Sequence, residues 1–206
     1  SKISALRTYG AEFYGPVSAQ SEKGGTTHFS VLDGAGNAVA CTLTINTRFG
    51  SKVVAPGTGI ILNNEIDDFS IQPGTPNTYG LIGIDANSIQ PGKRPLSSMS
   101  PSIIMENDRP VLIVGGAGGP RIISAVLQTI LNVVDFRMPI DKAVEGARIH
   151  HQWIPNELAV EPGIPAETRA SLERRGHKVR ERDNLGVVQA ILVRNGKVFG
   201  KADPRK

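Results

Sequence analysis

The order in which strand-like and helix-like segments follow one another is the feature that most constrains how this chain folds. Three pairs of segments have the alternation or apolar run of paired strands, and each pair is joined by a turn rich in Asn, Asp or Gly. The predicted hairpins are 28–33 with 38–45 around Gly-Ala-Gly-Asn, 102–116 around Asn107 and Asp108, and 187–200 around Asn195 and Gly196.

Helical spacing of apolar residues occurs between the second and third hairpins. Residues 121–136 have this spacing, Asp141 is placed to cap a short helix over 141–149, and 165–176 predicts an amphipathic helix that Gly176 ends. Strands, then helices, then strands predict an α+β fold of stacked layers and not alternating βαβ units. Apolar residues make up 39% of the 206 residues, which is enough for one core.

Two long segments have no sustained period. Residues 46–98 are rich in Pro and Gly, and a loop of that length inside a compact domain is usually functional. Residues 1–25 end in Ser21, Gly24 and Gly25, and we interpret them as a linker or pro-segment ahead of a domain over 26–206.

Composition argues against several functions. The net charge of +4 is modest, and its basic cluster is interrupted by acidic residues without interleaved aromatics, so no nucleic-acid partner is expected. That cluster is Arg174, Arg175, Lys178, Arg180 and Arg182. The single Cys41 permits no intrachain disulfide and is expected to pack as a small apolar residue. No apolar run reaches the ~18 residues of a membrane span, and no signal peptide is visible.

The four histidines also fail to predict a metal site or another cofactor. None of His28, His150, His151 and His177 forms an i, i+4 pair with another, which is the spacing of a helical zinc motif. No spacing in the chain identifies a Ser-His-Asp triad, although spacing alone does not exclude one.

Thr26 and Thr27 follow two glycines where the first strand begins. A threonine at a newly made N-terminus carries its own base, because an α-amine titrates near ~7.7–8. The preceding glycines would let the peptide adopt the strained geometry of an N→O acyl shift. From this feature alone, an ordinary linker before a threonine-rich strand is the favoured interpretation.

Two further segments suit the recognition of charged groups. The run NNEIDDF at 63–69 brings two amides and three carboxylates together, which suits an ammonium group or a hard cation, or else forms a solvated turn. The run GGAGGPR at 115–121 precedes a predicted helix. Successive N–H groups in such a turn bind an anion, a phosphate or the oxyanion of acyl transfer, and a tight packing turn is the alternative.

Taken together, these features resemble the small subunit of the γ-glutamyltranspeptidase family, within the N-terminal-nucleophile hydrolases. The similarity extends over about 180 residues, from Thr26 to the end, and its segments follow in the family's order. They are TTHFSVLDGAGNAVACTLTINTRFG at 26–50, GIILNNEIDDFS at 59–70, PNTYGLIG at 76–83, NSIQPGKRPLSSMSPSII at 87–104, GGAGGPRII at 115–123, ARIHHQWIPNEL at 147–158 and FGKADPR at 199–205. The resemblance implies an αββα sandwich, of which this chain supplies the small-subunit part.

The resemblance also implies a role for individual residues. The precursor would cleave itself between Gly25 and Thr26, and Thr26 would then be the nucleophile, supported by the hydroxyl of Thr44. Gly118 and Gly119 match the oxyanion-hole donors. The residues that match the substrate-binding positions are Asn46, Glu65 and Asp68 for the α-amino end, Ser97 and Ser98 for the α-carboxylate, and Tyr79 as a lid over the pocket.

The implied activity is transfer of a γ-glutamyl group from a glutathione-like amide to water or to an amine, without a cofactor. The family needs a large subunit that this chain lacks, and residues 1–25 resemble the tail of that subunit. Without it, apolar side chains of AVACTLTI and IISAVLQTILNVV are expected to be exposed. The chain is then expected to self-associate, or to cover this surface with residues 1–25. The alternatives are a related acylase for β-lactam side chains or poly-γ-glutamate, and an inert unprocessed fragment. The resemblance suggests a periplasmic or extracellular location.

Overall fold

The structure is a computed structural model that describes residues 25–205, and it contains the three predicted hairpins. Strand β1 (Thr26–Leu32) pairs antiparallel with β2 (Ala38–Thr44) as a two-stranded sheet. The other two hairpins, β3 (Ser102–Glu106) with β4 (Arg109–Ala117) and β8 (Val187–Arg194) with β9 (Lys197–Ala202), join in one antiparallel sheet of order β3-β4-β8-β9.

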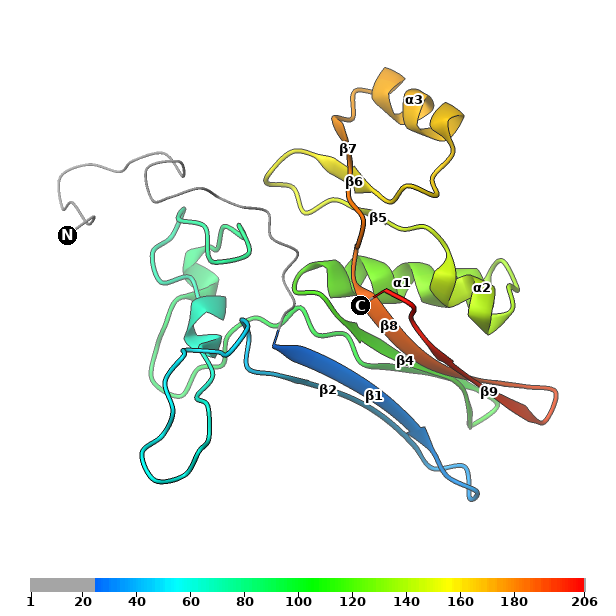
Figure 1. Cartoon of the computed structure of the whole chain (residues 1–206), viewed down its shortest axis with the longest axis horizontal. Helices are drawn as coiled ribbons and strands as arrows, with labels where there is room; N and C mark the ends of the chain where they lie inside the picture. Colours follow the sequence, from blue (N-terminus) through cyan, green and yellow to red (C-terminus); the bar gives the residue numbers. More distant parts are fainter. Residues whose placement is uncertain (1–24, 206) are drawn as a thin grey trace.

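The layers of the fold are visible in Figure 1, where the β1–β2 hairpin lies against one face of the four-stranded sheet and helices α1 (Arg121–Val134) and α2 (Ile140–Glu145) cover the other. The main apolar core lies between this sheet and the helices. Its buried residues include Leu112, Val114 and Val188 of the sheet and Ile122 and Val126 of α1. The predicted α+β fold of stacked layers is therefore confirmed.

His28 fills the space between the two sheets. Alternation along β1 turns Thr26, His28 and Ser30 toward the four-stranded sheet, and His28 is only 7% exposed. A Cβ at Gly115 of β4 would lie 2.2 Å from the imidazole ring, so a side chain at that position is sterically excluded. The first glycine of the glycine-rich segment therefore serves the packing of the two sheets.

A third sheet was not predicted from the sequence. It contains β5 (Ile149–His150), β6 (Leu158–Val160) and β7 (Val179–Glu181), and the parallel pair β6–β7 is joined through α3 (Ala166–Arg174). Strands of two or three residues are too short to produce a readable alternation. The chain therefore contains one βαβ connection in addition to its hairpins.

The predicted helix ends are right in one case and wrong in another. Gly176 has φ +93° directly after the C-cap of α3, Arg175, as expected for a glycine that ends a helix. The predicted cap at Asp141 is wrong, because α2 begins at Ile140 and Pro139 occupies the cap position without a side-chain hydrogen bond. Asp141 instead lies in the first turn, where a carboxylate interacts favourably with the helix dipole.

Buried ion pairs attach the end of the chain to the layered part. Arg148 is 2% exposed, and its Nη2 lies 2.7 Å from Asp203 Oδ2, while Arg205 Nη2 lies 2.7 Å from Glu161 Oε2. Arg148 Nη1 also donates to the carbonyl oxygen of Gly186 at 2.6 Å. A Cβ on Gly118 would meet the Cα of Gly186 at 2.9 Å, so this network supports the glycine turn ahead of α1.

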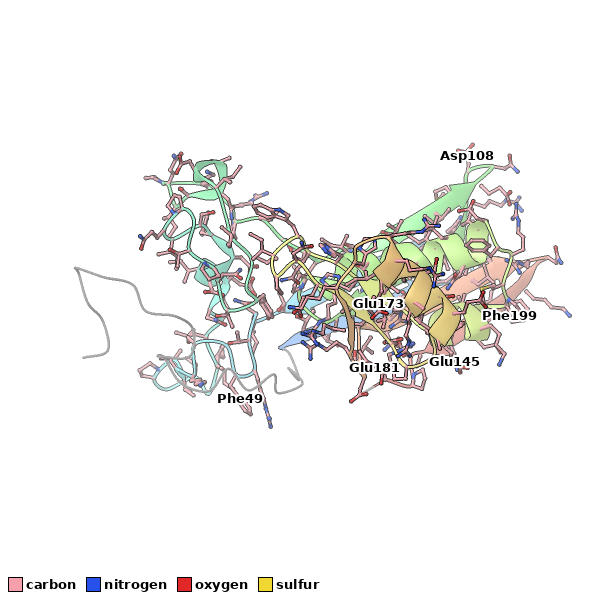
Figure 2. All side chains as sticks on the ribbon, turned by 90° about the horizontal axis from the view of Figure 1, so that it is seen from above. Phe49, Asp108, Glu145, Glu173, Glu181 and Phe199 are labelled. Atoms are coloured by element: carbon pink, nitrogen blue, oxygen red, sulfur yellow. The ribbon has the colours of Figure 1, made fainter. Side chains whose placement is uncertain are left out.

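Residues 46–98 lie beside the layers and contain the 3₁₀ turns η2 (Glu65–Asp68) and η3 (Asp85–Asn87). Figure 2, viewed from above, shows this segment, which includes Phe49, to one side of the sandwich. Isolated bridges such as Val54 with Ile61 replace regular strands here. In the described part of the chain, no helix is long and apolar enough to cross a membrane.

Apolar side chains remain exposed on two outer faces. The side of the β1–β2 hairpin turned away from the four-stranded sheet and the outer side of α1 both carry them, as expected for the two segments named from the sequence. They are Phe29, Val31, Val39 and Leu43 on the hairpin, and Ile123, Leu127 and Leu131 on the helix. Cys41 is half-buried and pairs with Phe29 in the hairpin.

Candidate active site

One pocket contains nearly all of the catalytic and binding residues predicted from the sequence. Its lining includes Thr26, Thr44, Asn46, Glu65, Asp68, Tyr79, Ser97, Ser98 and Gly119. Gly118 is not among the lining residues and directly precedes Gly119. Leu81, Met99, Pro120 and Ile122 complete the wall, and these apolar residues carried no sequence signal of their own.

The two threonines meet because of the hairpin register. Thr26 lies opposite Thr44 across β1 and β2, which turns both side chains to one face and brings their hydroxyl oxygens within 2.9 Å. Thr44 Oγ1 also accepts the N–H of Asn46 at 2.8 Å, and a hydrogen bond from Thr44 lowers the pKa of Glu65. In the contact between Thr26 and Thr44, either hydroxyl can be the donor.

Gly25 continues the hairpin ladder ahead of Thr26. Its carbonyl oxygen accepts the N–H of Ile45 at 3.1 Å, and its own N–H donates to the carbonyl of Asn46 at 3.3 Å. A Cβ on Gly25 would lie 2.5 Å from the carbonyl oxygen of Thr47. The Gly25 to Thr26 peptide is thus fixed beside the Thr26 hydroxyl, and in the unbroken chain the nitrogen of Thr26 is an amide that cannot act as a base.

Glu65 and Asp68 face each other because a 3₁₀ turn aligns residues three apart. Burial, with the nearby charge of Asp68, raises the pKa of Glu65 to about 7. Burial also raises the pKa of Asp68, while its hydrogen bond with Glu65 opposes that shift. The pair therefore shares a proton near neutral pH, and an ammonium group in the pocket would take the place of that proton.

Asn46 connects the threonine hairpin to the acidic turn. It is 3% exposed and has φ +70°, a left-handed conformation that asparagine tolerates better than most residues. Its Nδ2 donates to the carbonyl of Asn64 at 3.1 Å. Its own carbonyl accepts the hydroxyl of Tyr79 at 2.9 Å.

Tyr79 lies at the tip of a tight turn. The side-chain oxygen of Asn77 accepts the N–H groups of Tyr79 and Leu81, each at 3.0 Å, and shapes this turn. The Tyr79 ring packs on Gly119, where a Cβ would lie 2.8 Å from the ring. Tyr79 therefore lines the pocket beside the glycine turn.

The glycine turn leads directly into α1. Gly118 and Gly119 have φ +139° and +58°, and their carbonyls accept the N–H groups of Arg121 and Ile122 in the first helical turn. Strand, glycine turn and helix N-terminus together are the arrangement in which backbone N–H groups stabilise an anion. Ser97, which also lines the pocket, lies in an irregular segment, and its Oγ accepts the N–H of Met99 at 3.2 Å.

Other chemistries find little support in the described residues. No group of three or more His, Cys, Asp or Glu side chains between 25 and 205 is arranged to hold a metal ion. A serine and a histidine do meet, since Ser124 Oγ lies 2.8 Å from His150 Nδ1. The other ring nitrogen of His150 contacts Gln152 and no carboxylate, and neither residue of the pair lines the pocket. This pair is therefore no Ser-His-Asp triad.

Comparison with known proteins adds independent information. A family model described as gamma-glutamyltranspeptidase matches residues 1–206. The chain is 48% identical over 188 residues to the glutathione hydrolase proenzyme of Escherichia coli, an alignment that covers 91% of this chain and 32% of that protein. The chain thus spans about a third of the length of the curated relatives it matches.

Solved structures agree with the sequence comparison. A crystal structure of a Helicobacter pylori gamma-glutamyltranspeptidase mutant is 49% identical and superimposes with a TM-score of 0.84, over 87% of this chain and all of that one. A cephalosporin acylase from Bacillus halodurans is 30% identical with a TM-score of 0.74, over 87% of this chain and 32% of that one. The fold is therefore that of the N-terminal-nucleophile hydrolases.

Proposed function

Because the chain belongs to the γ-glutamyltranspeptidase family, we propose that it is the small-subunit part of an enzyme that transfers γ-glutamyl groups after cleaving itself before Thr26. The observation that carries the proposal is the 2.9 Å contact between the hydroxyls of Thr26 and Thr44, in a pocket that also contains the carboxylates of Glu65 and Asp68. Residues 1–25 would be the tail of the large subunit, and of these only Gly25 is among the described residues.

Self-cleavage requires one hydroxyl and one strained peptide. Thr26 Oγ1 attacks the carbonyl carbon of Gly25, the C–N bond breaks, and the nitrogen of Thr26 takes the hydroxyl proton, which leaves an ester. The amine of Thr26 is free after this shift, and water then hydrolyses the ester, which frees the hydroxyl of Thr26 and releases the carboxyl group of Gly25. The N–H of Ile45, which donates to the Gly25 carbonyl, would stabilise the oxyanion in this step.

Turnover uses the same hydroxyl with the new amine as base. The amine accepts the proton of Thr26 Oγ1 as that oxygen attacks the γ-carbonyl of the substrate, and the N–H groups of Gly118 and Gly119 receive the oxyanion. The leaving amine departs with the proton, and an acyl-threonine ester remains. Water or an acceptor amine then attacks this ester and regenerates the threonine.

Substrate orientation follows from the charges around the pocket. The ammonium of a glutathione-like γ-glutamyl group would displace the shared proton of Glu65 and Asp68 and form charge-assisted hydrogen bonds. Ser97 and Ser98, which also line the pocket, would receive the α-carboxylate. Tyr79, closed over Gly119, would exclude water from the acyl-threonine.

The large subunit of the same precursor is the proposed partner. The chain spans about a third of its curated relatives, and the outer faces of the β1–β2 hairpin and of α1 expose apolar side chains such as Phe29, which is 44% exposed. Exposed apolar surface of this kind is typical of an interface. Without that subunit we expect the chain to self-associate and to show negligible turnover.

A related acylase is the second candidate, since a cephalosporin acylase has 30% identity with the same fold. The acidic pair favours an acyl group that carries an α-ammonium, so γ-glutamyl donors rank first. Comparison of a γ-glutamyl anilide with the analogue that lacks only its α-amino group separates the two. Equal turnover of both compounds would favour the acylase.

The central test replaces the nucleophile and follows the mass of the intact chain. Thr26→Ala is expected to abolish release of the ~25-residue N-terminal piece and all γ-glutamyl turnover, because the same hydroxyl performs both steps. Thr26→Ser retains hydroxyl and amine, and should keep part of both activities. Release of the piece by the alanine variant at the wild-type rate would refute the assignment, and an inert fragment would release none even as wild type.

A further inference from the structure

The lid turn is connected to the layered part of the molecule through Gln152, a residue outside the pocket. The side-chain nitrogen Nε2 of Gln152 donates to the carbonyl of Tyr79 and to the carbonyl of Ile154, each at 3.2 Å. Gln152 follows β5, which is distant in sequence from the lid. The contact therefore crosses from the layered part to the tip of the turn that carries Tyr79.

The orientation of the Gln152 amide determines the protonation of His150. Two carbonyl oxygens surround one end of the amide, so that end must be the nitrogen, and the oxygen Oε1 faces His150 Nε2 at 3.0 Å. His150 Nε2 must therefore carry a proton and donate it. In the neutral ring, Nδ1 is left to accept the hydroxyl of Ser124 at 2.8 Å.

The surroundings of His150 favour this neutral form. The side chain is 8% exposed, and burial lowers its pKa more than the hydrogen bond with Gln152 raises it, while the charge of Arg121 acts in the same direction as burial. The ring is therefore a fixed link between one donor and one acceptor. The three hydrogen bonds form one series that runs in a single direction: Ser124 donates to His150, His150 donates to Gln152, and Gln152 donates to the backbone of the lid.

The base of this series is firmly attached to α1. Gln128 on that helix accepts the N–H of Ile149 at 3.0 Å and donates to its carbonyl at 2.8 Å, which fixes β5 just ahead of His150. Helix α1 begins directly after the glycine turn, and Tyr79 packs on Gly119 of that turn. The helix that presents the anion-binding turn thus also anchors the series that reaches the lid.

We infer that Ser124, His150 and Gln152 are positioning residues that hold the Tyr79 lid closed over the pocket. None of them lines the pocket, so they act on the substrate only through the lid. The inference rests on the proposed function for its consequence, which is control of water access to the acyl-threonine. The structural part of the inference is that these hydrogen bonds hold the turn with Tyr79 in place, and this can be tested without any γ-glutamyl activity.

The test is limited proteolysis of the full chain with chymotrypsin, with the products identified by mass. Cleavage after Tyr79 requires the lid to open, while cleavage after Phe136, which is 71% exposed and distant in sequence, provides an internal reference. Gln152→Glu keeps the size of the side chain and the bond to His150, but places a carboxylate oxygen against the two carbonyls. We expect the ratio of Tyr79 to Phe136 cleavage to rise at least about threefold.

The matched control is Asn132→Asp, which makes the same amide-to-carboxylate change in a side chain of α1 that donates to the carbonyl of Ala143 at 3.2 Å and not to the lid. It should leave the cleavage ratio unchanged. His150→Phe, which removes the donor that orients the amide, should raise the ratio less than Gln152→Glu. An unchanged ratio in Gln152→Glu, or an equal rise in Asn132→Asp, would overturn the inference.

Activity supplies a second readout in the processed enzyme with its large subunit. If Gln152 acts only through the lid, Gln152→Glu should change the ratio of hydrolysis to transfer in the wild-type background and have no further effect in Tyr79→Ala. Additive effects in the double variant would contradict the inference. If the proposed function were wrong, every variant would lack turnover but the proteolysis ratios would still change as expected. If the inference about the lid were wrong, the proteolysis ratios would not change, so the two cases are distinguishable.

Discussion

The β1–β2 hairpin and the loop segment 46–98 both supply walls of the pocket, but they hold their side chains by different means. In the hairpin, a regular ladder sets Thr26 opposite Thr44, and the buried His28 packs the hairpin on the sheet beneath. In the loop segment, side chains of asparagine replace the missing ladder. Asn87, for example, donates to the carbonyl of Asp68 at 2.7 Å and accepts the N–H of Leu96 at 2.9 Å.

This difference separates stability from recognition. The layered part contains the apolar core and the buried ion pairs, so changes there should unfold the protein. The loop segment contains the acidic pair, with pKa values raised by burial, and has few fully buried side chains. Changes there should alter substrate binding and leave the fold intact. The predictions below test this division.

The largest expected effect is on folding. Arg148→Met keeps the length of the side chain but leaves Asp203 buried without its partner, which should reduce the free energy of unfolding by about 3–5 kcal/mol, measured by urea denaturation. The exposed pair of Lys178 and Glu157 is the control, and Lys178→Met should change little. If Arg148→Met does not fold, adding Asp203→Asn should restore part of the loss. If the single variant were as stable as the wild type, the buried ion pairs would not contribute to the stability of the layered part.

The sequence predicted the layered part well because its elements are long and regular. Strands β1, β2, β4 and β8 are seven to nine residues long and were recognisable from alternation or from an apolar run, and helical spacing over the fourteen residues of α1 predicted that helix. It missed β5, β6 and β7, whose pairing depends on tertiary contacts such as those of Gln128 and not on local pattern.

The site was predictable for a different reason. Glu65 and Asp68 could be suspected from their own sequence, and the glycines before α1 likewise, since both are dense clusters of one chemistry. Ser97 and Ser98 carry no such signal and were found only through the family resemblance. The link from His150 through Gln152 to Tyr79 joins residues far apart in the chain, so no local pattern contains it.

The second prediction concerns recognition by the loop segment. Asp68→Asn should raise the KM for a γ-glutamyl substrate at least about tenfold in the processed enzyme, since a charge-assisted hydrogen bond is worth roughly 1.5–3 kcal/mol. Self-cleavage involves no ammonium and should proceed at the wild-type rate. Asp67→Asn makes the same change one residue away, where the side chain accepts the N–H of Thr78, and should leave KM nearly unchanged. Equal effects at the two positions would make Asp68 a structural residue.

The third prediction follows from the raised pKa of Glu65. Because burial and Asp68 bring this pKa to about 7, the pair increasingly keeps its proton as the pH falls below 7 and competes less well for an ammonium. The KM of the processed enzyme should therefore rise between pH 8 and pH 6, separately from the fall in kcat that follows as the Thr26 amine takes up a proton. Glu65→Gln should remove this inflection. A KM profile that stays flat through pH 7 in the wild type would show that Glu65 is not in the ammonium site.

The smallest expected effect, on stability, separates the two regions most directly. A carboxyl whose pKa is raised in the folded state favours folding at low pH relative to high pH. For Glu65, this contribution to stability is lost as the pH rises from about 4.5 to about 7. At pH 8 both carboxylates are charged and repel each other, so Glu65→Gln should raise the melting temperature there. At pH 4, where Glu65 is protonated in both states, the variant and the wild type should melt together. A gain of equal size at both pH values would point to better packing of the amide, and a loss at pH 8 would mean that the Glu65 carboxylate supports the fold. The expected gain in melting temperature accompanies a loss of substrate binding, because the Glu65 carboxylate that is repelled by Asp68 is also the group that receives the ammonium.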